Sequence, residues 1–166
     1  MHAETRGFTL IELLVTMAVA AILLGIAVPN YQNFVISSRM ATQANDLITA
    51  LNMARSEAVK RGANVTVCAG AAGCASTAWA QGWNVSAGGA VVRVQQALGG
   101  ASTLNPGAQV INGVTFASTG RTTIAAGATA AGTTFTLCPP SPATVQGRAI
   151  QIERTGRTAV SAVNCP

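Results

Sequence analysis

The sequence has few of the residues from which enzyme active sites are built. Its 166 residues include one histidine, His2, and one lysine, Lys60, and charged residues make up 9% of the chain. No catalytic triad, Cys/His pair or histidine-ligated zinc site can form if His2 is removed or unstructured. The G-x-x-x-x-G-K-[ST] phosphate-binding pattern is also absent from the sequence. We therefore expect a non-enzymatic protein with no cofactor and no bound metal.

Acidic residues are scarce as well. Only five are present, and three of them, Asp46, Glu57 and Glu153, lie in the part that we expect to be water-soluble. Their wide separation along the chain does not favour a carboxylate pair for acid–base catalysis. Apolar residues make up 49% of the chain, which argues against a disordered protein. The length is that of one domain with a single core.

One long apolar segment stands near the N-terminus. Residues 8–28 contain a single charged residue, Glu12. As a helix at about 1.5 Å per residue, this segment spans about 31 Å, which matches the hydrocarbon core of a bilayer. Seven residues precede it, and Arg6 among them favours a cytoplasmic N-terminus.

Glu12 is unusual in such a segment because a charge within the bilayer costs roughly 2.5–3.5 kcal/mol. We interpret it as a functional residue that requires a cationic partner; the alternative is a side chain that reaches the lipid interface. A cleaved secretory signal peptide is a further alternative, with Gly25-Ile26-Ala27 as its small-x-small cleavage site. Against it stand Glu12 and the helical pattern that continues after Pro29.

Residues 7–13, GFTLIEL, resemble the class III signal of type IV pilins and pseudopilins. The resemblance implies that a prepilin peptidase cuts after Gly7 and that Phe8, the new N-terminal residue, is N-methylated. It also implies that Glu12 pairs with the N-terminal amine of a neighbouring subunit during filament assembly. His2 and Arg6 would be lost with the leader.

The pattern after the apolar segment predicts an amphipathic helix followed by strands. Pro29 is expected to kink the helix, and apolar residues then recur at steps of three and four up to Arg61, with Gly62 as the C′ cap. Two T-G-R sequences, at residues 119–121 and 155–157, predict turns with glycine at positive φ. Period-two patterns predict strands at residues 65–68, 83–86, 91–96, 110–116, 133–137, 149–153 and 158–163, with a loop at 125–132.

Three further motifs resemble the GspH/FimT group of minor pilins and pseudopilins: A-N-D-L at residues 44–47, A-R-S-E-A at 54–58 with the following K-R-G at 60–62, and W-x-x-G-W at 79–83. We expect Trp79 and Trp83 to pack the sheet against the helix. The resemblance implies an α+β type IV pilin fold, in which a long N-terminal helix packs on a C-terminal antiparallel β-sheet domain. The expected division is a leader at 1–7, a transmembrane helix at 8–28, its amphipathic half at 29–62 and a periplasmic β-rich domain at 63–166.

Four cysteines follow the apolar segment and agree with an oxidising periplasm. They are Cys68, Cys74, Cys138 and Cys165. Four cysteines allow three pairings, and the sequence does not choose between them. We prefer Cys68–Cys74 with Cys138–Cys165; a metal site is the rival interpretation, although the spacings are not C-x-x-C.

Three arginines near the C-terminus, Arg148, Arg154 and Arg157, have only Glu153 against them. Arginine suits bidentate contact with phosphate, so this patch is a candidate site for double-stranded DNA. Some FimT-like proteins bind DNA through a C-terminal G-R-x-R motif, and this sequence lacks the second arginine after both Gly147-Arg148 and Gly156-Arg157. The alternative is a solvated basic sheet edge.

The sequence thus predicts a structural minor pilin or pseudopilin of the bacterial inner membrane. A type IV pilus and a type II secretion pseudopilus both fit, and the resemblance slightly favours the pilus. The expected partners are other major and minor pilins or pseudopilins, the prepilin peptidase, the inner-membrane assembly platform and membrane lipid. DNA uptake in natural transformation is the alternative function.

Overall fold

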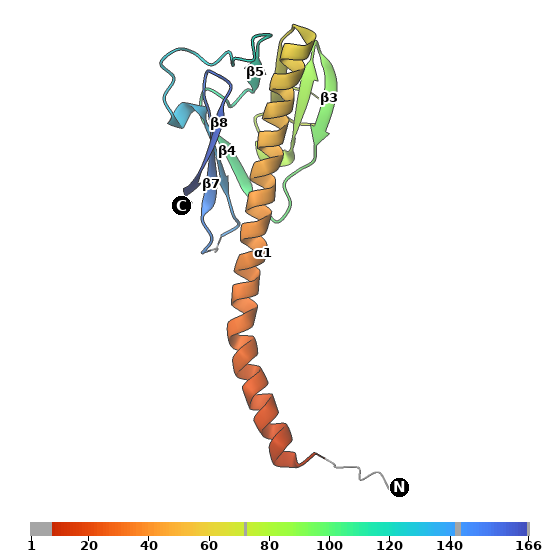
Figure 1. Cartoon of the computed structure of the whole chain (residues 1–166), viewed down its shortest axis with the longest axis vertical. Helices are drawn as coiled ribbons and strands as arrows, with labels where there is room; N and C mark the ends of the chain where they lie inside the picture. Colours follow the sequence, from red (N-terminus) through yellow and green to blue (C-terminus); the bar gives the residue numbers. More distant parts are fainter. Residues whose placement is uncertain (1–7, 72, 142–143, 166) are drawn as a thin grey trace. The chain divides into compact units, whose positions relative to one another are not determined.

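A long helix, α1, forms the N-terminal part of the computed structural model, which describes residues 8–71, 73–141 and 144–165 (Figure 1). Helix α1 covers Leu10–Arg61 and runs through Pro29 without interruption. It ends where the sequence predicts. Gly62 adopts φ +62°, and the N–H of Ala63 donates to the carbonyl of Ala58 over 3.3 Å. This is the glycine-capped C-terminus in which a left-handed residue returns the chain to the last turn.

Eight strands and two short 3-10 helices follow α1 in the described residues. They are β1 (Val65–Ala69), η1 (Trp79–Gln81), β2 (Trp83–Ala87), β3 (Ala90–Gln95), β4 (Thr103–Pro106), β5 (Val114–Phe116), η2 (Ala131–Thr133), β6 (Thr134–Cys138), β7 (Gly147–Ile152) and β8 (Thr158–Val163).

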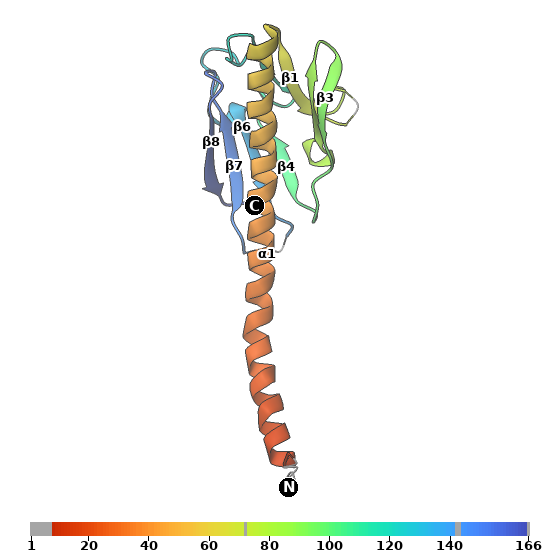
Figure 2. The same cartoon turned by 45° about the vertical axis from the view of Figure 1, so that its right-hand side comes forward.

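The strands form two four-stranded antiparallel sheets, in the orders β3-β2-β1-β5 and β4-β6-β7-β8. Figure 2 shows the C-terminal half of α1 lying across both sheets. The α+β class and the helix packed on antiparallel strands are confirmed. The sequence analysis predicted one β-sheet, and the structure has two.

One predicted strand is shortened in the structure, and one strand was missed. The predicted strand at 110–116 is shortened to β5, because Gly113 adopts φ +133° and its N–H donates to the carbonyl of Val110, which makes a turn. Strand β4 was not predicted. It has four residues, and its last residue is Pro106, so it shows no period-two pattern that would reveal it.

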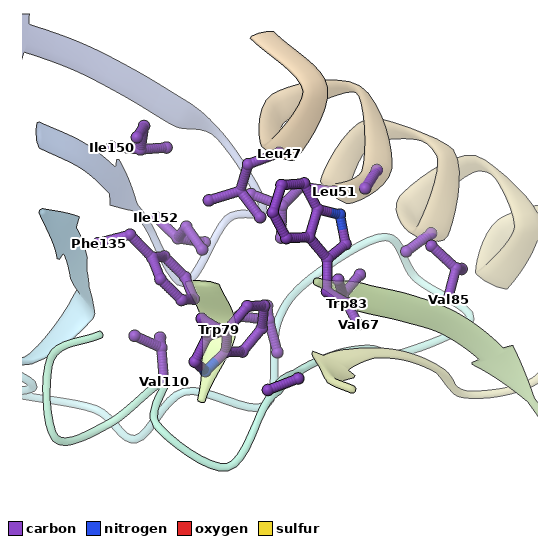
Figure 3. Close-up of a cluster of buried hydrophobic side chains, with 14 of the residues drawn as sticks. Leu47, Leu51, Val67, Trp79, Trp83, Val85, Val110, Phe135, Ile150 and Ile152 are labelled. Carbon is purple, nitrogen blue, oxygen red and sulfur yellow. The ribbon is translucent and has the colours of Figure 1, made fainter. Parts of the chain in front are cut away.

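The compact unit that covers residues 36–166 has one hydrophobic core. Helix α1 contributes a stripe of small and aliphatic side chains to this core: Met40, Ala44, Leu47, Ala50, Leu51, Ala54 and Ala58. Figure 3 shows Leu47 and Leu51 reaching from α1 into the cluster that also contains Trp79, Trp83 and Phe135. The alanines let the strands approach the helix closely, and the aromatic side chains fill the space between the layers.

Both tryptophans are core residues, as the sequence predicts. Trp79 and Trp83 are fully buried. The rings of Trp79 and Phe135 lie edge to face, with centroids 4.5 Å apart, and the Trp79 Nε1–H donates to the carbonyl of Ile111 over 3.0 Å. The W-x-x-G-W motif therefore has a packing role in this chain.

Candidate functional site

The beginning of α1 carries the candidate assembly residue, Glu12. Thr9 precedes the helix and caps it, because its Oγ1 accepts from the Glu12 N–H over 3.3 Å and its carbonyl accepts from the Leu13 N–H over 3.2 Å. Glu12 is therefore the third residue of the helix, where the helix dipole favours a negative charge. The predicted cleavage residue Gly7 lies outside the described residues, and Phe8 is exposed.

Every side chain from residue 8 to residue 32 is exposed. The most apolar window of α1 has a mean hydropathy of 2.5 and none of it is buried, so the helix is long and apolar enough to cross a membrane. No cation lies within ion-pair distance of Glu12 among the residues that the structure describes.

The second candidate site lies around the two T-G-R turns. Both glycines have positive φ, +74° at Gly120 and +81° at Gly156, as the sequence predicts. The turns lie against each other, because a Cβ added at Gly156 would overlap the carbonyl oxygen of Gly120. The N–H of Thr122 also donates to the carbonyl of Arg154 over 3.0 Å.

Arg55 of α1 joins the two turns to the helix. Its Nη1 donates to the carbonyl of Gly156 over 3.4 Å, and its guanidinium lies beside both turn glycines. The sequence analysis assigned Arg55 to the A-R-S-E-A motif and predicted no contact for its side chain. In this structure it positions the turns that carry Arg121 and Arg157.

The arginines of this site differ from the group named from the sequence. Arg121, Arg154 and Arg157 are exposed on the adjacent turns, and no ion pair involves them in the described part of the chain. Arg148 is half-buried on β7, where it pairs with Ala162 of β8. It lies four residues before Ile152, the last residue of β7, which is about 13 Å along an extended strand. The structure therefore places Arg121 with Arg154 and Arg157 and sets Arg148 apart. The repeated T-G-R sequence was the signal that could have identified Arg121.

A second charged group lies at the C-terminal end of α1. Glu57 accepts from the Arg61 Nε–H over 2.6 Å, and Lys60 Nζ lies 4.0 Å from its other oxygen. The hydrogen bond from Arg61 lowers the pKa of Glu57, and the positive charges of Arg61 and Lys60 add to this effect. Glu57 therefore pairs with Arg61 and Lys60, and it forms no ion pair with Arg121, Arg154 or Arg157 in the described residues.

The four cysteines form two disulfides, Cys68–Cys74 and Cys138–Cys165. These are the pairs that we preferred from the sequence. The first closes a short loop around the buried side chain of Asn84, whose Nδ2 donates to the carbonyl of Gly70 over 2.6 Å. The second joins the end of β6 to the segment after β8.

Comparisons with known proteins agree with this architecture. The family model described as type II transport protein GspH matches residues 43–156, and the prokaryotic N-terminal methylation motif matches residues 4–28. The crystal structure of the type IV minor pilin FimU of Pseudomonas aeruginosa superposes with a TM-score of 0.58 over 75% of this chain and 89% of that chain, at 22% identity.

Two curated relatives are similar in sequence. The prepilin peptidase-dependent protein D of Escherichia coli is 32% identical over 116 residues, which cover 68% of this chain and 80% of that protein. The type IV major fimbrial protein FimA of Dichelobacter nodosus is 39% identical over 54 residues, or 31% of this chain. The match covers about a third (35%) of the length of FimA.

The apolar N-terminal helix, the methylation motif and the antiparallel sheets define a type IV pilin-like protein with a membrane-anchoring helix. The family model covers most of the chain, and the chain belongs to the GspH family of pilin-like proteins. The fold and the family are those of structural pilus and pseudopilus subunits. The resemblance read from the signal and from the helix motifs is confirmed.

Proposed function

We propose that this chain is a minor pilin or pseudopilin that is anchored in the bacterial inner membrane and added to a filament as a structural subunit. The observation that carries the proposal is the exposed apolar segment at residues 8–32, which contains one carboxylate, Glu12, without a cationic partner among the described residues. Residues 1–7 form the leader, 8–28 the transmembrane helix, 29–62 its amphipathic half and 63–166 the periplasmic part. The N-terminus lies in the cytoplasm.

Processing supplies the partner that Glu12 lacks. A prepilin peptidase cuts after Gly7 and methylates Phe8, which leaves a charged amine at the beginning of the mature chain. A charged residue in the bilayer costs roughly 2.5–3.5 kcal/mol, and an amine delivered by a neighbouring subunit offsets that cost. Pairing between subunits is thereby favoured over isolated subunits in lipid. The inner-membrane assembly platform and other pilins or pseudopilins are the partners of this step.

The test compares Glu12→Ala with Thr16→Ala, a control in the same exposed segment. We expect both variants to insert into the membrane. The amount of Glu12→Ala in sheared filaments should fall sharply, while Thr16→Ala should match the wild type. Equal incorporation of Glu12→Ala and the wild type would contradict the assembly role of Glu12.

The filament can be a type IV pilus or a type II secretion pseudopilus. The matching family model is described as a type II transport protein, and the similar solved structure is a type IV minor pilin. We favour the pilus on the N-terminal signal and the A-R-S-E-A motif. Deletion of the gene should then reduce surface pili and leave protein secretion unchanged; the reverse result would indicate a pseudopilus.

A second candidate function is binding of double-stranded DNA during natural transformation. The observation that favours it is the placement of the exposed Arg121, Arg154 and Arg157 on two adjacent turns. Three phosphate contacts would give weak binding. The logarithm of the association constant would fall linearly with the logarithm of the salt concentration, with a slope of about −0.9 for each phosphate contacted.

A titration with duplex DNA at several salt concentrations tests this candidate. We expect Arg154→Ala and Arg157→Ala to weaken binding and to reduce the salt slope by about one each. Arg148→Ala is the matched control and should bind like the wild type if the turns alone form the site. Binding that is absent at low salt, or that does not respond to salt, would exclude this function.

A further inference from the structure

Strand β8 is a long sheet edge without the usual protection. It pairs with β7 on one side and ends the sheet on the other. Its sequence, T-A-V-S-A-V, has no charged residue and no proline. The side chains of residues 159–162 are all exposed, including Val160 at 47%, so neither face of the strand is covered. Natural sheets normally protect such an edge with charges, proline, bulges or short strands.

The other sheet edges in the described residues have this protection. Strand β3 carries Arg93 and pairs with β2 through a register shift at Val85/Ser86. Strand β4 ends at Pro106, and β5 has three residues. The contrast indicates that β8 is kept open for pairing.

Strand β8 is also held at both of its ends. In the turn before it, the Gly156 N–H donates to the carbonyl of Glu153 over 2.9 Å, and Arg55 donates to the carbonyl of Gly156. After it, Cys165 is joined to Cys138 at the end of β6. An edge fixed in this way loses little conformational freedom when another strand pairs with it.

The charges around β8 select the kind of strand that fits. Arg154 and Arg157 are exposed at the beginning of β8, and no ion pair involves them in the part of the chain that the structure describes. The exposed Glu153 on the same turn accepts instead from the Thr155 hydroxyl over 3.0 Å. A strand with a carboxylate near this end would complement them. This chain does not supply one, because β3 carries Arg93 and no edge strand among the described residues contains an acidic residue.

We propose that β8 binds an extended strand of a different pilin-like subunit, which extends the sheet and places a carboxylate against Arg154 and Arg157. The backbone N–H and C=O groups of β8 provide affinity, and the arginines select the partner and its register. The inference rests on the proposed function as a filament subunit. It excludes a second copy of this chain as the occupant of β8.

The first test uses the full chain in the membrane of the bacterium that expresses it, with a photo-crosslinking amino acid at Ala159. We expect a crosslink to a strand of another subunit that carries a prepilin signal, identified by peptide mass. A crosslink to a second copy of this chain, or no crosslink to any pilin-like subunit, would overturn the proposal. This measurement does not require assembled filaments, so its result is independent of filament incorporation.

The second test compares Ser161→Lys on β8 with Asn112→Lys in an exposed turn, which adds the same charge elsewhere. Because lysine on an edge strand opposes pairing, we expect Ser161→Lys to lower the crosslink yield by about tenfold at an unchanged unfolding midpoint. Asn112→Lys should not lower it. An unchanged yield in Ser161→Lys would overturn the proposal even if the chain enters filaments normally. A lower crosslink yield in Arg157→Ala, with an unchanged yield in Ser161→Lys, would also overturn the proposal. The arginines would then bind their partner without pairing to β8, as they would in DNA binding.

Discussion

Removal of the Cys138–Cys165 disulfide should destabilise the compact unit at residues 36–166 more than removal of Cys68–Cys74. The two bonds join residues 27 and 6 positions apart. The chain-entropy relation gives about 3.5 kcal/mol for the longer loop and about 2.2 kcal/mol for the shorter one, because a longer loop restricts the unfolded chain more strongly.

The assay is urea unfolding of a chain that begins at residue 36, with each cysteine pair replaced by alanine. Alanine is chosen because Cys68 is fully buried and Cys138 is nearly so, and a serine hydroxyl would be left without water there. Both variants should unfold in a single two-state transition, with a larger denaturant slope than the wild type because the unfolded chain without the cross-link exposes more surface. A larger loss for Cys68–Cys74 would refute the loop-entropy reasoning. It would mean that contacts within the folded loop, such as the Asn84 hydrogen bond, dominate.

Three further predictions follow from the core, the turns and the end of α1. Leu51→Ala should lower the free energy of unfolding by roughly 2–5 kcal/mol in the same assay, because Leu51 is fully buried. Gly156→Ala should cost more than about 1 kcal/mol, because φ is +81° and the added Cβ has no space, whereas Gly99→Ala should stay within about 0.5 kcal/mol. Arg61 lowers the pKa of Glu57, so the stability that this pair adds should be present above the ordinary carboxyl pKa and be lost as the pH falls through the lowered value. Glu57→Gln should remove that part of the pH dependence, measured by unfolding at several pH values.

Local signals in the sequence predicted much of the fold. The end of α1 followed from one glycine, because Gly62 can adopt the left-handed conformation without a steric cost. The same argument predicted positive φ at Gly120 and Gly156. Burial of Trp79 and Trp83 followed from their size in a chain with few aromatic residues. The positive-φ glycines depend on residues that are close together in the sequence, whereas the tryptophans are buried by distant contacts and only their burial was predicted.

Features that depend on distant contacts could not be predicted in this way. The contact between Thr122 and Arg154 joins two turns 32 residues apart, and it brings Arg121 into a group that the sequence had assigned to the C-terminus alone. Strand β4 belongs to the second sheet only through its pairing with β6, which lies about thirty residues further along the chain, and it has only four residues. Arg148 appeared close to Arg154 because they are near in sequence, but an extended strand separates residues by about 3.3 Å each.

The mass of the mature chain, extracted from the membrane of the bacterium that expresses it, tests the central claim most directly. The account predicts a chain that lacks residues 1–7 and begins with N-methylated Phe8, with α1 and its Glu12 retained. A chain that begins after Ala27 would contradict it, because the apolar segment would then be a cleaved signal peptide. A chain that still begins with Met1 would show that the prepilin peptidase does not process this protein, and the assembly mechanism through Glu12 would fail.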